Sequence, residues 1–447
     1  MINTSYENKS KNKRLNESGL TSYDKDIAMN RGEKVLEKGI GFKNVFKDFK
    51  RDINSKNITA ALAGGAFGLP AGIVMISAGT AAGLSSELII LWVTSVYLIG
   101  GIFGILIPAY YRIPIPIASS LAAAVLFATA VSQVGLAESL GATIIAGIIV
   151  FLAGTTGSMG KIIELIPTPI VMAMVGGVFL SFGLDLVSSL ESALLPAILM
   201  IGTFIIVTRF APVVPPVLAS IIVGVVYLLV SDVSFAGVEF SVEYPELVLP
   251  AFSFESFLIY GLPLILILIG MENPTAIALL KNEGFKDTPV NGISAINGFA
   301  TAFGAFFGAY NTCTAGPMVG LFGSSEAGPK EKRWVGAILF GVIFIVAAPF
   351  YGSLVSLFEE MPGFFVAIIA GLALLKVLIT TIGGSLGAET HKIGAMFAFL
   401  IAASEITILG IDSAFWALII GFAISLLIEP QDFKFIGNKK QYNKHSA

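Results

Sequence analysis

Residues 264–274 read Leu-Ile-Leu-Ile-Leu-Ile-Gly-Met-Glu-Asn-Pro, an apolar run that one carboxylate, Glu272, interrupts. The run belongs to a longer apolar segment, residues 256–280, which is long enough to cross the roughly 30 Å of hydrocarbon in a bilayer as a helix. Both Glu272 and Pro274 are unusual inside such a segment, because a charge is costly in hydrocarbon and a proline removes a backbone hydrogen bond. The stretch predicts a membrane helix that contains a polar break.

The whole chain is rich in such apolar segments. Of its 447 residues, 55% are hydrophobic and only 13% are charged, whereas about 25% are charged in a typical soluble domain. Helices satisfy their own backbone polar groups in lipid, so we predict an all-α polytopic membrane protein with about 14 transmembrane helices. A soluble α/β protein is the disfavoured alternative. The predicted spans are residues 58–80, 88–107, 116–132, 140–158, 167–185, 193–208, 213–231, 256–280, 290–308, 313–325, 333–351, 363–383, 392–408 and 412–429.

The basic residues predict which loops share one side of the membrane. The first 57 residues contain 13 of the 27 Lys and Arg, and the segment after Pro430 contains 4. The predicted spans place nearly all the others on the side of these two tails, whereas the opposite loops carry carboxylates without Lys or Arg. Cytoplasmic loops are enriched in Lys and Arg. We therefore predict a bacterial inner-membrane protein whose tails, residues 1–57 and 430–447, are both cytoplasmic.

Three short motifs recur in order at nearly one spacing. Gly-Leu-Pro at 68–70 recurs 193 residues later, the motif at 166–167 recurs 195 residues later, and the motif at 221–224 recurs 197 residues later. Each half then holds seven spans, an odd number, so the second half is inverted relative to the first, as is typical of secondary transporters. The two predicted halves are residues 58–231 and 256–429, joined by an extracytoplasmic loop, residues 232–255.

The third and tenth spans are short and begin with stretches that a regular helix does not accommodate. Residues 111–116 contain two prolines, and residues 310–317 occupy the equivalent place in the repeat. The two short helices would meet with their N-termini near the midplane, where free N–H groups favour an anionic or electron-rich ligand. Simple kinked helices are the alternative. The ligand-binding residues predicted here are Ser119, Ser120, Asn311, Thr312 and Thr314.

Glu272 is the strongest single candidate for function. A carboxylate at that depth normally faces the interior of a helix bundle or a cavity, so Glu272 is the predicted proton-coupling and substrate-binding residue, with Asn273 beside it. A structural ion pair is the alternative, and Lys376 is its potential partner unless that side chain extends to the cytoplasmic surface. Phe67 is a further candidate, because its ring can stack on a ligand from the first span.

The sequence contains no signature of an enzyme or a metal protein. Cys313 is the only cysteine, so the chain has no intrachain disulfide and no thiolate cluster. Metalloprotease, hydrolase and P-loop motifs are absent. We predict that the protein is not an enzyme and needs neither cofactor nor metal. The predicted partners are a small-molecule substrate, a proton and the lipid bilayer, and nucleic acid is excluded.

Further motifs in the second half carry a family resemblance. They are Gly261-Leu262-Pro263-Leu264 with Asn273-Pro274, Glu326-Ala327 with Pro329 and Arg333-Trp334, residues 370–375, and residues 409–416. Together they resemble the benzoate:proton symporters, which belong to a larger group with nucleobase:cation symporters and sulfate permeases. The resemblance covers about residues 58–429.

The resemblance implies a core domain and a gate domain, with the substrate between spans 1, 3, 8 and 10. It also implies an elevator movement of the core against the gate, and members of the wider group often form homodimers. The implied core is residues 58–158 with 256–351, and the implied gate is residues 167–231 with 363–429.

Two substrate classes stay open. The family usually has a glutamine at the position of Glu272, whereas nucleobase symporters have a substrate-binding glutamate in that region. The favoured prediction is proton-coupled symport of benzoate or a related aromatic carboxylate. Symport of a nucleobase-like neutral heterocycle on the same fold is the first alternative. A passive anion channel and a membrane enzyme follow.

Overall fold

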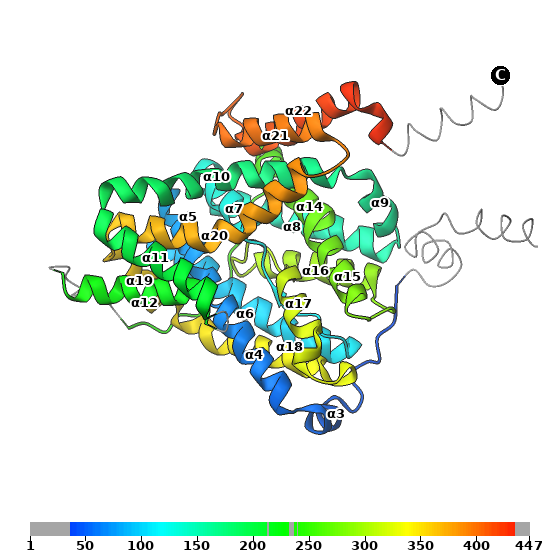
Figure 1. The fold of residues 1–447 in the computed structure, drawn as a ribbon. Helices are drawn as coiled ribbons and strands as arrows, with labels where there is room; N and C mark the ends of the chain where they lie inside the picture. The colour runs from blue at the N-terminus through cyan, green and yellow to red at the C-terminus, as the bar shows by residue number, and fades with distance from the viewer. Residues whose placement is uncertain (1–35, 212–213, 232–236, 239, 434–447) are drawn as a thin grey trace, which may run out of the picture.

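The computed structural model describes residues 36–211, 214–231, 237–238 and 240–433 and is dominated by helices (Figure 1). Helical segments occupy every predicted span. Within the described residues, 7 helical stretches are long and apolar enough to cross a membrane, and several shorter apolar helices accompany them. The predicted all-α polytopic membrane fold is confirmed.

The first half contains one short strand among its helices. Its elements are α4 (Ser55–Gly68), α5 (Ala71–Ala81), α6 (Ser86–Tyr111), β1 (Ile117–Ala118), α7 (Leu121–Val134), α8 (Leu136–Thr155), α9 (Met159–Leu165), α10 (Thr168–Ser192), α11 (Leu194–Phe210) and α12 (Pro216–Leu229). The helix α3 (Val45–Asp52) precedes them.

The second half begins with a span that is partly π-helical. That span runs through α13 (Phe254–Ser256), η2 (Phe257–Gly261), α14 (Leu262–Ile267), η3 (Leu268–Glu272) and α15 (Asn273–Asn282). The elements that follow are α16 (Val290–Ala305), β2 (Cys313–Thr314), α17 (Gly316–Gly323), α18 (Trp334–Ala347), α19 (Tyr351–Glu359), α20 (Gly363–Leu386), α21 (Lys392–Ala403) and α22 (Ser413–Ile428). Short 3-10 turns lie at Ser325–Ala327, Lys330–Lys332, Ala348–Phe350 and Pro430–Asp432.

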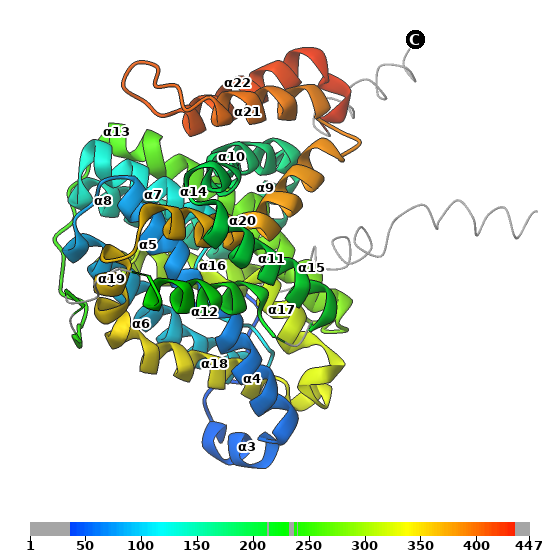
Figure 2. The same cartoon turned by 60° about the vertical axis from the view of Figure 1, so that its left-hand side comes forward.

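The described chain begins and ends on the same side of the molecule, at the right of Figure 1. The helix α12, after which the chain passes to the second half, ends on the opposite side. The pair α21 and α22 lies over α10, while α3, α4 and α18 lie at the far end of the molecule (Figures 1 and 2).

The helix packing supports two related halves. The helix α8 packs along α16, and α6 packs along α18; exchanging the halves converts one pair into the other. A Cβ added to Gly147 would lie 2.7 Å from the carbonyl oxygen of Gly298, and a Cβ added to Gly341 would lie 2.8 Å from that of Gly101. The equivalent residues are 194 and 197 positions apart, so the same close glycine contact occurs in both halves.

Residues 42–49, before the first predicted span, contain the start of α3. The Asp52 carboxylate anchors α3 to the protein. It accepts hydrogen bonds from the Arg51 guanidinium at 2.8 Å and from the indole N–H of Trp334 at 3.2 Å. A second ion pair joins Asp48 to Arg112 at 3.2 Å. The helix α3 is therefore held against the start of α18 and the end of α6.

The Asp52 contacts predict a pH-dependent stability. The hydrogen bond from Arg51 lowers the pKa of Asp52 below its ordinary value of 3.8; burial opposes this shift, and the Trp334 indole and Lys332 add to it. A lowered pKa stabilises the fold above the ordinary value and loses that effect as the pH falls through the native one. We expect Asp52→Asn to lower the melting temperature at pH 7 and to make little difference under strongly acidic conditions.

Thermal unfolding of the detergent-solubilised protein at both pH values measures this effect. The exposed Glu331 is the matched control, and Glu331→Gln should change neither melting temperature. An Asp52→Asn variant that melts like the wild type at pH 7 would contradict the anchoring role.

Candidate functional site

The two broken spans meet at a short antiparallel strand pair. In β1 and β2, Ile117 pairs with Thr314 and Ala118 pairs with Cys313. The helix α7 starts at Leu121 and α17 starts at Gly316, directly after these strands. The predicted meeting of two helix N-termini is therefore present in the structure. We call residues 117–120 and 310–316 the strand crossing.

Ser120 lies at the start of α7 with its hydroxyl unpartnered. Its side chain is 1% exposed, and its Oγ has no hydrogen-bond partner among the described residues. The carboxyl group of Glu272 lies near enough to interact with this hydroxyl, without the geometry of a hydrogen bond. A buried polar group without a partner is costly, so Ser120 is well placed to bind a ligand.

Glu272 ends the π-helical stretch η3, a kind of irregularity that is frequent at functional sites. Its side chain is half-buried rather than sealed in the bundle. The possible partner, Lys376, is exposed on α20, and the described residues contain no ion pair between the two. Glu272 thus faces Ser120 from the other half of the protein without a cation to neutralise it.

Ser119 is the other hydroxyl at the start of α7. Tyr310 donates a hydrogen bond from its phenol to Ser119 Oγ at 2.8 Å, and Tyr260 donates to the backbone oxygen of Tyr310 at 2.9 Å. Ser119 keeps part of its surface accessible, whereas both tyrosines are fully buried. The two tyrosines were not predicted from the sequence, because a polar contact across the repeats leaves no local pattern.

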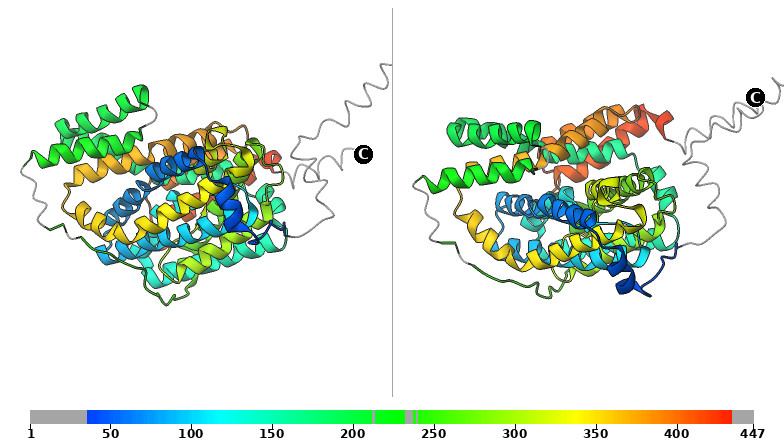
Figure 3. Two further views of the ribbon diagram at one scale, coloured as in Figure 1. Left: turned by 90° about the horizontal axis from the view of Figure 1, so that it is seen from below. Right: turned by 60° about the horizontal axis from the view of Figure 1, so that its bottom comes forward.

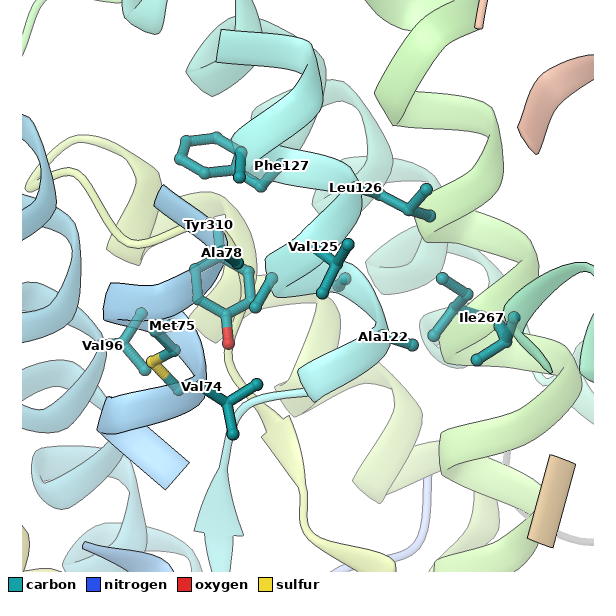
Figure 4. Packing of buried hydrophobic residues seen from close by; sticks show 14 of the residues in the cluster. Val74, Met75, Ala78, Val96, Ala122, Val125, Leu126, Phe127, Ile267 and Tyr310 are labelled. Carbon is teal, nitrogen blue, oxygen red and sulfur yellow. The ribbon is translucent and has the colours of Figure 1, made fainter. Parts of the chain in front are cut away.

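Aromatic rings form a wall beside these hydroxyls. The ring centroid of Tyr310 lies 5.7 Å from that of Phe127 and 6.0 Å from that of Trp92. Figure 4 shows Tyr310 between α5 and α7, next to Met75 and Ala78. The three rings are buried and packed against one another, and the faces of such rings suit packing beside a planar ring.

Asn311, Thr312 and Thr314 make their contacts inside the protein. The side-chain oxygen of Asn311 accepts a hydrogen bond from Ser120 N at 3.2 Å. Thr312 exchanges backbone hydrogen bonds with the Thr301 hydroxyl of α16, at 2.9 and 3.1 Å, and its own hydroxyl faces α16 at Gly304. These predicted residues do come together at the strand crossing, where they hold its shape.

A buried network of side-chain hydrogen bonds connects Asn273, the residue after Glu272, to the strand crossing. Asn297 donates to the side-chain oxygen of Asn273 at 2.7 Å and accepts from the Thr314 hydroxyl at 3.1 Å. Asn273 also donates to Ser294 at 3.3 Å. Sequence reasoning missed Asn297. The signal was a polar stripe along span 9, where Ser294, Asn297 and Thr301 recur at helical spacing.

Phe67 makes no ring contact with this group among the described residues. It is on α4 and is 46% exposed. No group of three or more His, Cys, Asp or Glu side chains gathers in the described ranges as metal ligands would.

The sequence of the chain is similar to that of known membrane transport proteins. Residues 52–427 match the family BenE, described as Benzoate membrane transport protein. The inner membrane protein YdcO of Escherichia coli (strain K12) is 31% identical over 357 residues, which cover 78% of this chain and 89% of that protein. The Benzoate membrane transport protein of Acinetobacter baylyi is 30% identical over 362 residues, 80% of this chain and 91% of that protein.

Two solved structures have a similar fold. The transmembrane domain of the cyanobacterial bicarbonate transporter BicA matches with a TM-score of 0.56 at 15% identity, over 87% of this chain and 99% of that chain. SLC26A9 matches with a TM-score of 0.56 at 13% identity, over 83% of this chain and 64% of that one. Identities this low show a shared fold alone.

Proposed function

The chain belongs to the BenE family of benzoate membrane transport proteins and is a membrane transporter rather than an enzyme, and we propose that it carries benzoate or a related aromatic carboxylate together with a proton. The observation that carries this proposal is the Ser120 hydroxyl, which is buried without a hydrogen-bond partner and faces Glu272. An aromatic acid would offer an acceptor for this hydroxyl and a planar ring that can pack against the neighbouring aromatic side chains.

The carboxylate of the substrate would accept hydrogen bonds from Ser120 and from the N–H groups at the start of α7, where the helix dipole favours a negative charge. Its ring would pack against the aromatic wall of Tyr310, Phe127 and Trp92. The same two strands bring α7 and α17 together, so the start of α17 adds its dipole. Ser119 and Tyr310 would fix the polar end of the site.

Glu272 would couple the substrate to a proton. An ionised Glu272 would repel a substrate carboxylate bound at Ser120. In the described part of the chain, no cation pairs with Glu272 to reduce this repulsion. Protonation removes the repulsion and lets Glu272 donate a hydrogen bond. Binding of the anion would therefore require one bound proton, and release of the proton would expel the anion.

Movement of a core domain against a gate domain would expose the site to each side in turn. Spans 1–4 with 8–11 would form the core and spans 5–7 with 12–14 the gate. The packing supports this grouping, because α6 packs on α18 and α8 on α16, whereas α10 packs on α20 and α21. We further propose that both tails are cytoplasmic in a bacterial inner membrane, as the basic residues predict.

The second candidate cargo is a nucleobase-like neutral heterocycle. Glu272 is the observation that favours it, because a carboxylate accepts hydrogen bonds from ring N–H donors without needing to be protonated. A passive anion pore is less well supported, since the inverted halves and the buried strand crossing are features of alternating access.

Counterflow in proteoliposomes tests the proposal. Vesicles loaded with unlabelled benzoate should transiently concentrate labelled benzoate, which a carrier does and a pore does not. Parallel vesicles loaded with uracil test the heterocycle. A thermal-shift comparison of both ligands gives an independent readout, since a ligand at about 100 times its Kd stabilises the native state by about 2.7 kcal/mol. Counterflow with neither compound would overturn the assignment of cargo.

Ser120→Ala is expected to weaken benzoate binding. Loss of one hydrogen bond to a charged group costs about 1.5–3 kcal/mol, or on the order of tenfold to a hundredfold in affinity. Titrations followed by tryptophan fluorescence measure this change. Ser188→Ala, on the exposed face of α10, is the control that should bind normally. Equal affinity in both variants would place the carboxylate elsewhere.

A further inference from the structure

An apolar groove is formed by one helix of the first half and one helix of the second half, and its lining includes no residue of the strand crossing. It lies between α4 and α18, which run side by side in Figure 3, and has a volume of about 300 Å³. Leu62 and Val342 line it and are 63% and 41% exposed. Its lining residues are Ile53, Ile58, Ala61, Leu62, Leu339, Val342 and Ile343.

One end of the groove meets α3. Ile53 lines the groove and is the residue directly after α3. The inner face of α3 packs through Phe49 against the ring of Trp334, with centroids 6.2 Å apart. Phe46, which shares a helical face with Ile53 at a spacing of seven residues, is 71% exposed. The helix thus presents an outward apolar face that continues into the groove.

Lysines accompany this apolar face. Lys43, Lys47 and Lys50 are all exposed, and the Lys50 ammonium lies 4.5 Å from the centre of the Phe46 ring. An amphipathic helix with Phe on one side and Lys around it lies in the headgroup region of a membrane and favours anionic lipids. The end of the groove that Ile53 lines is therefore next to a helix suited to contact lipid phosphates.

A further lysine precedes α18. Lys332 is half-buried and ends the 3-10 turn Lys330–Lys332, just before the helix whose residues Leu339, Val342 and Ile343 line the groove. It is close enough to Asp52 to interact with it. Asp52 and Asp48 are engaged by Arg51 and Arg112. The exposed Glu331 is the remaining acid next to Lys332, so a basic excess surrounds the mouth of the groove.

We propose that this groove binds one acyl chain of an anionic phospholipid, whose phosphate Lys50 and Lys332 hold at the end of α3. A narrow apolar groove suits an alkyl chain, and two ammonium groups at its mouth complement a phosphate. The bound lipid would join α3 to both α4 and α18, and so fasten the first and second halves to each other. This inference does not depend on which cargo the protein carries.

Thermal unfolding of the full chain in detergent tests the proposal with phosphatidylglycerol and phosphatidylcholine of identical chains. We expect phosphatidylglycerol to raise the melting temperature more than phosphatidylcholine, and glycerol phosphate alone to leave it unchanged. A double variant, Lys50→Gln with Lys332→Gln, should lose the extra rise. The control, Lys161→Gln, removes an exposed lysine after α8 and should keep it.

A second variant tests the groove itself. Val342→Trp fills the groove from an already exposed position and should abolish the dependence of lipid stabilisation on acyl-chain length. Ile379→Trp, at a position on α20 that is 65% exposed, should preserve that dependence. Equal stabilisation by both lipids, or the same shift from glycerol phosphate, would overturn the proposal. A change from dimer to monomer in Val342→Trp would instead assign the groove to a second copy of the chain.

Discussion

Glu272→Gln is expected to abolish proton-driven accumulation of substrate while leaving exchange in place. Glutamine has nearly the same shape and keeps an acceptor oxygen near Ser120, but its amide neither takes up nor releases a proton in the pH range of the experiment. The substrate can then bind and cross, yet its movement is no longer tied to the proton gradient. Uphill uptake should fail although the site remains occupied.

The size of the effect follows from the gradient. One pH unit corresponds to about 1.4 kcal/mol per proton, which supports about tenfold accumulation when one proton accompanies each substrate. Wild-type proteoliposomes with an acidic exterior should approach that ratio. The Glu272→Gln vesicles should stop at equal concentrations inside and outside, and their uptake rate should lose its dependence on external pH.

A matched carboxylate separates this effect from a general change in charge. Glu405 is exposed after α21, and Glu405→Gln should accumulate substrate like the wild type. Counterflow in the same Glu272→Gln vesicles shows whether the site still binds. Unchanged uphill uptake in Glu272→Gln would remove Glu272 from the mechanism, whereas loss of counterflow as well would assign it to binding alone.

The architecture was predictable because membrane insertion constrains every span locally. The length of each apolar segment, the positions of the basic residues and the recurring Gly-Leu-Pro motif can all be read directly from the sequence. They follow from the cost of exposing backbone and charge to lipid. The two proline-rich or polar stretches before α7 and α17 were visible for the same reason. A regular helix does not accommodate them, and the chain instead forms two paired strands.

The contacts of the site were less predictable, because they join residues far apart in the sequence. Tyr310 reaches Ser119 across 191 residues, and Ser120 also meets Asn311 across 191 residues. No local pattern specifies such pairs. Asn311 was predicted from the sequence to bind a ligand. In the structure its side-chain oxygen instead accepts a hydrogen bond from the backbone N–H of Ser120. The polar stripe on α16 that contains Asn297 was visible, but its role depends on which helix it faces.

Gly298→Val is expected to have the largest effect on stability, because it separates the two helices that support the site. A Cβ at Gly298 would lie 2.3 Å from Phe151 N and 2.6 Å from the carbonyl oxygen of Gly147. Both are backbone atoms of α8, so no rotamer change relieves the contact. Overpacking typically costs about 1–3 kcal/mol, and a backbone clash at this distance should reach or exceed that range.

Fluorescence-detected size exclusion and thermal unfolding measure this loss. Gly202→Val is the control, since an added Cβ on that glycine of α11 meets nothing within 4 Å. Gly341→Val tests the repeat, because its Cβ would lie 2.8 Å from the carbonyl oxygen of Gly101. If the two halves use the same helix contact, both variants should fail alike while Gly202→Val melts like the wild type. A Gly298→Val protein of wild-type stability would show that α8 and α16 can separate freely. That freedom would also release Asn297, the neighbour of Gly298, from the network that positions Glu272 beside the strand crossing.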